Sequence, residues 1–182
     1  MVNAIGFLEL SSIAKGVEAA DAILKAAESD LIYSKATCPG KYTILFKGDV
    51  AAVKSSLDAG LAIGGPMVVD SVVIPRVHPL VIKAIGLGAV PDHCNAVGVM
   101  EFFSITAAVY AADAAVKAAE VELIDLRLGT GIGGKCFAVV TGEVSAVREA
   151  IDAGVKLGSE KGLVVSSVVI PNPRPEVFTA LL

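Results

Sequence analysis

The residues of this sequence best suited to chemistry are its three cysteines, Cys38, Cys94 and Cys136. Cysteine thiolates ligate soft metals and iron–sulfur clusters. However, no two of these cysteines have the C-x-x-C spacing of a metal or redox motif, and their odd number argues against a disulfide framework. Cys136, in the apolar run KCFAVV, is predicted to be a buried core thiol, and Cys94 beside His93 provides only two ligands. From its neighbours alone, Cys38 in KATCPGK is a small apolar residue beside a proline.

A second candidate is the glycine-rich segment LGTGIGGK, residues 128–135. Gly129, Gly131 and Gly134 satisfy the G-x-G-x-x-G spacing of dinucleotide-binding loops, and Asp152 follows about 20 residues later. That fingerprint requires a helix next, whereas the following CFAVVTG is typical of a strand, so we reject a dinucleotide site. Because the segment has no titratable group before its final lysine, its backbone N–H groups can face small polar solutes or anions.

The elements that position these residues occur twice, because the chain is an internal repeat. More than half of the positions in the first aligned pair of segments are identical. Two small insertions in the second copy account for the changed offset of the later pairs. The matching segments are 4–32 with 96–124, 41–60 with 135–154, and 70–75 with 166–171. We therefore predict a first domain over residues 1–88, a linker over 89–95 and a second domain over 96–182.

Each copy predicts the element order β-α-β-β-α-β, which is that of a ferredoxin-like α+β fold with an antiparallel sheet and its helices on one face. Ser12 stands where an N-cap would begin the first helix, and Asp49 where one would begin the second. In the first copy we expect strands over 4–10, 31–36, 42–48 and 67–75, and a first helix over 13–28. The expected buried positions are Val17, Ala20, Ile23, Leu24 and Ala27 on the first helix and Val53, Leu57 and Leu61 on the second.

Composition limits the classes of function. The chain has 182 residues, 54% of them hydrophobic but only 5% aromatic, which favours oligomer interfaces in addition to a core. The longest stretch without a charged residue, Gly162–Pro173, is too short to span a membrane, and MVNAIGFLEL is not a secretory signal. A net charge of −4 without a basic run argues against nucleic acid as a partner. We expect a cytoplasmic protein.

The repeated motifs resemble a known family. AIGxLE, a helix ending in DAILKAA, GDVAAV, DAG and VIP near an RP pair, all in this order and present twice, are similar to the bacterial microcompartment shell domain. The two fused, unpermuted copies resemble the tandem-domain members of that family. The resemblance implies a homotrimer imitating a hexameric ring, a structural role rather than an enzymatic one, location in a microcompartment shell, and edge-to-edge contact with other shell proteins.

The resemblance also implies residues at the tile edge. In the family a lysine near the C-terminus of the first helix pairs across the tile boundary, and here Lys25 and Lys117 match it. From the sequence alone, both are ordinary solvated lysines near a helix C-terminus. The arginine of the edge RP motif corresponds to Arg174, and in the first copy Arg76 and His78 are its expected substitutes.

In such rings the hairpin loops after the second strand of each domain point to the central axis. Cys38 then resembles the iron–sulfur-binding trimeric shell proteins of propanediol-utilisation compartments. The resemblance implies one [4Fe–4S] cluster per trimer, ligated by Cys38 from three subunits, for electron transfer or cluster delivery across the shell, with encapsulated redox enzymes as possible partners. The expected pore-loop residues are Thr37, Pro39, Gly40, Thr130, Gly131, Ile132 and Gly133.

Two other functions stay open at this point. In the first, the same shell tile carries no metal at Cys38 and its loops form a pore for small metabolites. In the second, the chain is a discrete trimeric ferredoxin-like sensor or binding protein that forms no sheets. Glu9 and Glu101 occupy equivalent strand positions, so we expect them to be elements of the fold and not a catalytic pair.

Overall fold

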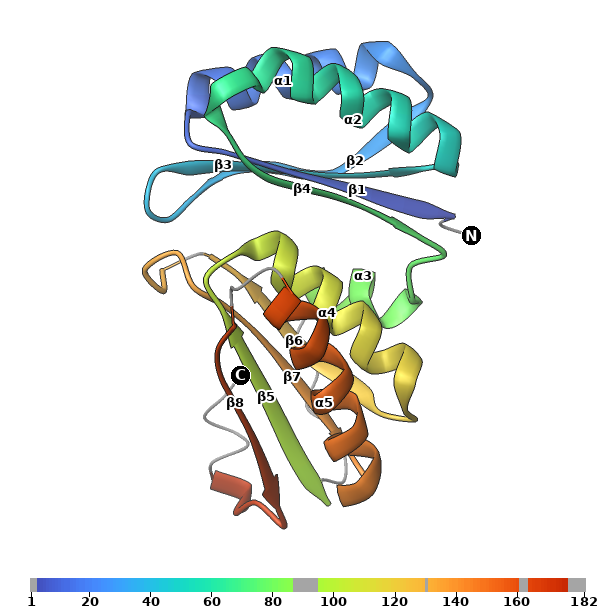
Figure 1. Ribbon diagram of the computed structural model, residues 1–182, viewed down its shortest axis with the longest axis vertical. Coiled ribbons are helices and arrows are strands. Elements are labelled where there is room, and N and C mark those ends of the chain that lie inside the picture. The colour runs from blue at the N-terminus through green and yellow to red at the C-terminus, as the bar shows by residue number, and fades with distance from the viewer. Residues whose placement is uncertain (1–2, 87–94, 130, 161–163, 177–182) are drawn as a thin grey trace. The chain divides into compact units, whose positions relative to one another are not determined.

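Two compact units, Met1–Val77 and His78–Leu182, make up the chain in a computed structural model that describes residues 3–86, 95–129, 131–160 and 164–176. Each unit contains a four-stranded antiparallel sheet with two long helices on one face (Figure 1). No helix of the described ranges is both long and apolar enough to cross a membrane. The predicted α+β fold and its duplication are confirmed.

The first unit follows the predicted element order. Its sheet has the strand order β2-β3-β1-β4, in which the first and third strands of the repeat lie side by side at the centre, as in ferredoxin-like folds. The elements are β1 Ala4–Leu10, α1 Ile13–Ala26, β2 Ser29–Thr37, β3 Lys41–Gly48, α2 Val50–Gly64, a 3₁₀ turn Gly65–Met67 and β4 Val68–Pro75.

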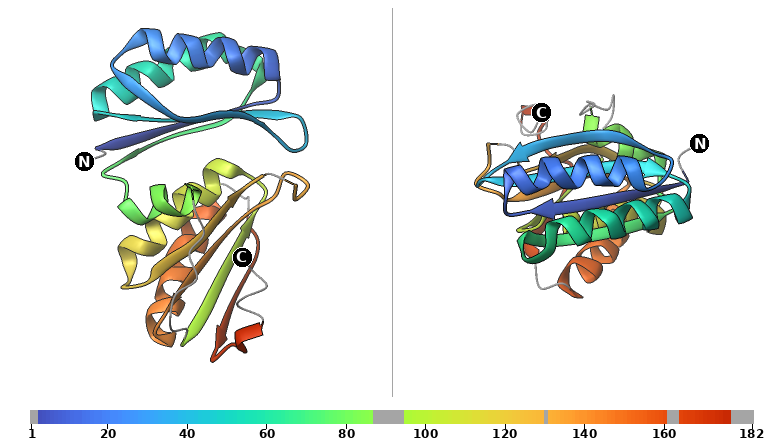
Figure 2. Two further views of the ribbon diagram at one scale, coloured as in Figure 1. Left: turned by 180° about the vertical axis from the view of Figure 1, so that it is seen from behind. Right: turned by 90° about the horizontal axis from the view of Figure 1, so that it is seen from above.

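The second unit repeats this topology, with strand order β6-β7-β5-β8. Seen from behind, in Figure 2, its two long helices again share one face of the sheet. The elements are α3 Pro79–Gly86, β5 Ala96–Phe102, α4 Ile105–Ala118, β6 Glu122–Leu128, β7 Cys136–Gly142, α5 Val144–Glu160 and β8 Val164–Pro171.

Local sequence explains where the first helix of each unit begins. The Ser12 hydroxyl accepts a hydrogen bond from the Lys15 N–H at 3.3 Å, and Ser104 does the same for Ala107. These caps satisfy backbone donors that have no partner inside the helix. Asp49 stands at the N-cap of α2 as predicted, but its carboxylate accepts instead from the Asn3 side chain at 2.5 Å.

The predicted buried face of α1 is partly wrong. Ala20 and Ile23 are buried, together with Gly16 and Ala19, but Val17 is 55% exposed and Leu24 43% exposed. The apolar stripe of this helix is wider than the strip that its own sheet covers, so periodicity alone could not tell which half packs. On α2, Val53 and Leu57 are buried as predicted, and Leu61 packs partly against the same core.

The repeat does not specify to which unit the chain segment between β4 and β5 belongs. The helix α3, which lies inside the predicted first domain of residues 1–88, belongs to the second compact unit, where it packs against β6 and α4. Within the predicted linker 89–95, only Asn95 is among the described residues. The predicted boundaries of the domains therefore stay a prediction.

Candidate functional site

The first hairpin loop presents Cys38 at its tip. The loop joins β2 to β3 directly after the pair formed by Thr37 and Lys41, and the N–H of Gly40 donates to the Thr37 carbonyl at 3.0 Å. Gly40 has φ +92, which is strained for any other residue. The Cys38 thiol is half-buried and forms no disulfide. It is thus available to an incoming metal or thiol reagent.

Both lysines that flank this loop have their charges engaged elsewhere. The ammonium of Lys41 donates to the fully buried carboxylate of Glu9 at 2.8 Å. The Lys35 ammonium lies over the ring of Tyr33, 4.8 Å from its centroid. A negatively charged group at Cys38 would therefore be balanced by cations that already have partners. The sequence could not indicate this, because both lysines appeared free.

The second hairpin loop is a glycine turn without a charged tip. Gly131 and Gly133 have φ +76 and +65, and a β-carbon added at either position would meet no other atom within 4 Å. The N–H of Lys135 donates to the Ile132 carbonyl at 3.3 Å, closing the turn. Thr130, the remaining predicted loop residue, lies outside the described residues. A strand, β7, follows this loop, so the structure agrees with rejecting a dinucleotide site.

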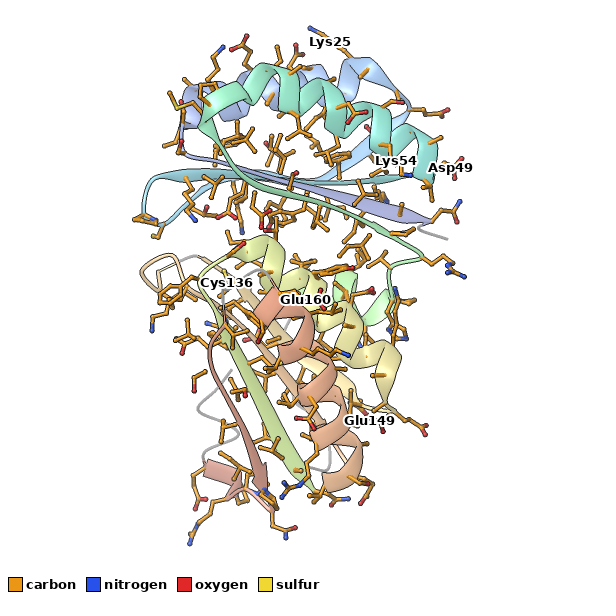
Figure 3. All side chains as sticks on the ribbon, viewed as in Figure 1. Lys25, Asp49, Lys54, Cys136, Glu149 and Glu160 are labelled. Carbon is orange, nitrogen blue, oxygen red and sulfur yellow. The ribbon has the colours of Figure 1, made fainter. Side chains whose placement is uncertain are left out.

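A single chain does not assemble a metal site from its described residues, where no three His, Cys, Asp or Glu side chains converge. Cys136 is fully buried in β7, as predicted for a core thiol (Figure 3). Cys94 and His93 lie outside the described ranges. Cys38 fits the role of a single ligand, because its thiol is reachable at a loop tip, and a cluster there requires thiols from further chains.

The two equivalent glutamates have a structural role that sequence reasoning found only in part. Glu9 of β1 pairs with Lys41 of β3, and Glu101 of β5 pairs at the same 2.8 Å with Lys135, directly before β7. Sequence analysis identified the glutamates as elements of the fold but missed their partners. The recurrence of both a glutamate and a lysine at matching positions of the two copies was the signal that could have found them.

The predicted edge lysines differ in their surroundings. Lys25 is 74% exposed and bridges to the exposed Asp21, one helical turn earlier, at 2.6 Å; Figure 3 shows it directed away from the unit. Lys117 pairs with Asp113 in the same way, but that carboxylate is 5% exposed. The ammonium of Lys117 therefore compensates a buried charge, whereas that of Lys25 is free to meet another surface.

Strand register decides which edge residues are equivalent. Pro75 and Pro171 pair with Ala4 and Ala96, the matching first residues of β1 and β5. Arg76 and Asn172 follow, and both adopt left-handed backbone, with φ 50 and 46. The counterpart of Arg76 is therefore Asn172. The counterpart of Arg174 is His78 alone.

This duplicated architecture matches a described family twice. The model of the BMC domain covers residues 4–77 and again 96–173, which is most of the chain. The chain belongs to the BMC-domain family. The predicted resemblance to tandem bacterial microcompartment shell proteins is thereby confirmed.

Individual relatives agree with this membership. The chain is 46% identical over its whole length to the bacterial microcompartment shell protein PduT of Citrobacter freundii, covering 99% of that protein. It is 31% identical to the carboxysome assembly protein CcmO of Synechococcus elongatus, covering 98% of this chain and 68% of CcmO.

Among solved structures, a crystal structure of a microcompartment protein from Desulfitobacterium hafniense superposes with a TM-score of 0.89 at 46% identity, covering 97% of this chain and 98% of that one. The fused permuted hexameric shell protein MSM0275 superposes with a TM-score of 0.67 at 22% identity, covering 86% of this chain and 83% of that one, and shows the shared fold.

Family membership confirms the expected class of function. The named BMC relatives are shell or assembly proteins and not enzymes, so the chain is a structural protein of a microcompartment shell, inside the cytoplasm.

Proposed function

We propose that three copies of this BMC protein form a homotrimeric ring of six domains, which serves as a pseudohexameric tile of the shell. The two units of one chain share their topology, so three chains supply six similar edges. Large apolar side chains also remain exposed on single units, among them Val17, Leu24, Val168 and Ile170. Exposed apolar surface of this kind is typical of protein–protein interfaces.

The tile carries a [4Fe–4S] cluster at its central axis, ligated by Cys38 from each of three subunits. The observation that carries this proposal is the half-buried, unpaired thiol at the tip of the first hairpin loop. The second loop has glycines at the corresponding place and no thiol, so each chain contributes one ligand. Thiolate is the usual protein ligand of such clusters.

The chain's own residues position Cys38 for this site. Gly40 permits the turn that presents Cys38, and the hydrogen bond from Gly40 to Thr37 fixes the ends of the loop. The pairing of Lys41 with Glu9 anchors the base of the same hairpin to the central strand β1. A bound [4Fe–4S] cluster supplies one-electron transfer, which suits electron transfer or cluster delivery across the shell, with encapsulated redox enzymes as partners.

A second candidate is the same tile without metal, conducting small metabolites. It is favoured by the second loop, where Gly131 and Gly133 turn through left-handed backbone and no atom stands where their β-carbons would be. Such a loop can present N–H groups to small anions. The two candidates differ in whether Cys38 binds iron.

At its periphery the tile meets other shell proteins edge to edge. Lys25, exposed and directed away from its unit, is the best placed of the predicted edge residues, with Arg76 exposed beyond β4. Lys117, His78 and Arg174 stay candidates for the same boundary.

The deciding experiment measures iron and acid-labile sulfide per trimer, with the visible spectrum, on anaerobically prepared protein and on Cys38→Ser. The matched control is Cys136→Ser, which removes the buried thiol of β7. We expect about four irons per trimer in wild type and in the control, and loss of iron in Cys38→Ser while the trimer persists. A wild-type protein without iron after anaerobic reconstitution would exclude the cluster and leave the metabolite pore.

A further inference from the structure

The first turn of α3 is anchored by a buried carboxylate of α4. The backbone N–H of His78, directly before α3, donates to Asp113 Oδ1 at 2.8 Å. Lys117 holds the other carboxylate oxygen, Oδ2. Asp113 therefore joins α4 to the segment that leaves the first sheet, and α3 packs from there against β6 and α4, with Val81 fully buried.

The segment after the second sheet has the same beginning. Arg76 and Asn172 share the left-handed backbone, and their N–H groups donate to equivalent carbonyls, those of Asn3 and Asn95. Two residues later come His78 and Arg174, each followed by a proline at which a helix begins.

In sequence, the correspondence continues through the rest of α3. Val81 matches Val177, Ala84 matches Ala180 and Ile85 matches Leu181. The three C-terminal residues of these pairs lie outside the described ranges. In sequence, residues 174–182 thus correspond to the segment 78–86, which contains α3.

The surface that would receive this segment lies bare on α1. Asp21 is the counterpart of Asp113, and Lys25 of Lys117, but the Asp21 side chain is 62% exposed and forms an ion pair with Lys25 on its own helix. Beside it on α1 stand the exposed apolar side chains of Ile13, Val17 and Leu24. On α1, the Asp21 carboxylate and the apolar stripe beside it are therefore exposed, whereas the Asp113 carboxylate of α4 is bonded to the segment that begins α3.

We propose that residues 174–182 of one copy dock on α1 of a second copy, where Asp21 accepts the backbone N–H of Arg174 as Asp113 accepts that of His78. The apolar residues Val177, Ala180 and Leu181 then cover the stripe formed by Ile13, Val17 and Leu24. This inference rests on the proposed trimer and identifies the contact that joins its chains.

The segment that docks on α1 comes from a second copy, because in this repeat the segment after a sheet packs on the next unit along the chain. The α3 segment leaves the first sheet and belongs to the unit that follows it along the chain, where it packs against β6 and α4. In the same direction, the C-terminal segment, which leaves the second sheet, packs on a unit of the first type, whose α1 carries the exposed Asp21, and a second copy supplies that unit. A head-to-tail contact of this kind is heterologous, and it closes into a ring when the rotation between copies permits.

Cross-linking between two variants, each with one introduced cysteine in addition to the fully buried Cys136, tests the contact. Asp21→Cys and Arg174→Cys are prepared separately, each on a background with Cys38 and Cys94 changed to Ser, mixed, and treated with a short bismaleimide. We expect covalent dimers that join position 21 of one variant to position 174 of the other. Asp58→Cys, an exposed carboxylate position on α2, replaces Asp21→Cys in the control mixture and should give few dimers.

A second measurement tests the hydrogen bond itself. Asp21→Ala should weaken trimer association about tenfold or more per contact in sedimentation velocity, because a hydrogen bond to a charged acceptor is lost. Asp21→Asn, which keeps an acceptor oxygen, should recover part of the affinity. Glu18→Ala, one turn away on the exposed face of α1, is the charge-matched control and should leave association unchanged.

The outcomes separate this inference from the proposed tile. Trimers that persist with no 21-to-174 cross-link and an unchanged affinity in Asp21→Ala would overturn the inference and leave the tile standing. A double variant with both cysteines that links only within single chains would overturn it as well. Wild-type protein that stays monomeric at every concentration would overturn both.

Discussion

The ammonium of Lys41 lies 2.8 Å from Glu9 Oε1 and joins the start of β3, directly after the first hairpin loop, to the central strand β1. Glu9 is fully buried, and Lys41 is 22% exposed. Such a carboxylate is stable as a charge only while it is paired. The pair therefore connects the loop that presents Cys38 with the core of its unit.

Lys41→Ala should destabilise the first unit by about 3 kcal/mol, because it leaves a buried carboxylate without its cation. Chemical denaturation at neutral pH, followed by circular dichroism, measures this loss. The matched control is Lys135→Ala, whose partner Glu101 is 31% exposed, and we expect a cost of about 1 kcal/mol or less. Equal costs for the two variants would contradict the role assigned to burial.

Gly16 and Tyr42 form a second pair whose counterpart in the repeat differs. A methyl group at Gly16 would lie 2.3 Å from the Tyr42 ring, whereas the second unit has Ala108 and Cys136 at these places, both fully buried. Gly16→Ala should therefore cost about 1–3 kcal/mol of unfolding free energy through overpacking.

Gly16→Ala combined with Tyr42→Cys restores the pair of the second unit. We expect this double variant to lose less than the sum of the two single variants, as measured by a double-mutant cycle in urea. Additive losses would show that the two positions do not compete for the same space.

Sequence reasoning predicted the duplicated α+β fold because the repeat, the caps and the turn residues all indicated the same elements. It failed on α1, where Val17 and Leu24 continue the apolar stripe of Ala20 and Ile23 but stay exposed. Periodicity identifies a stripe without stating whether the sheet of the same unit or another molecule covers it. The hydrogen bond from the His78 N–H to Asp113 could not be predicted either, because the donor is a backbone group that almost every residue type has.

The candidate site was predicted at the level of single residues. Cys38 stands out by its type and by the turn around it, and the structure places it half-buried at the loop tip. What the sequence could not give is the pairing of Lys41 with Glu9, since side-chain pairing across strands depends on register, or the position of the Lys35 ammonium over the Tyr33 ring of the same strand. Register is set by the burial of one face of the sheet together with the geometry of the turn.

The two described thiols should differ sharply in reactivity. In metal-free protein with Cys94 changed to Ser, Cys38 should react with a coloured disulfide reagent under native conditions, whereas Cys136, which is fully buried, should react only after unfolding. Reconstitution with iron and sulfide should protect Cys38. Native labelling of one thiol per chain, abolished in Cys38→Ser, is the expected result, and labelling of Cys136 at a similar rate would contradict the packing of β7.

The two edge lysines should respond differently to removal. Lys25→Ala deletes an exposed ammonium whose partner Asp21 is also exposed in the single chain, so the unfolding free energy of the first unit should stay unchanged while the formation of sheets or tubes falls, as seen by electron microscopy. Lys117→Ala leaves the buried Asp113 without its cation and should lower the unfolding free energy of the second unit by about 3 kcal/mol. If Lys25→Ala also unfolds the protein, or if sheets form as readily as in wild type, Lys25 does not act at the boundary between tiles.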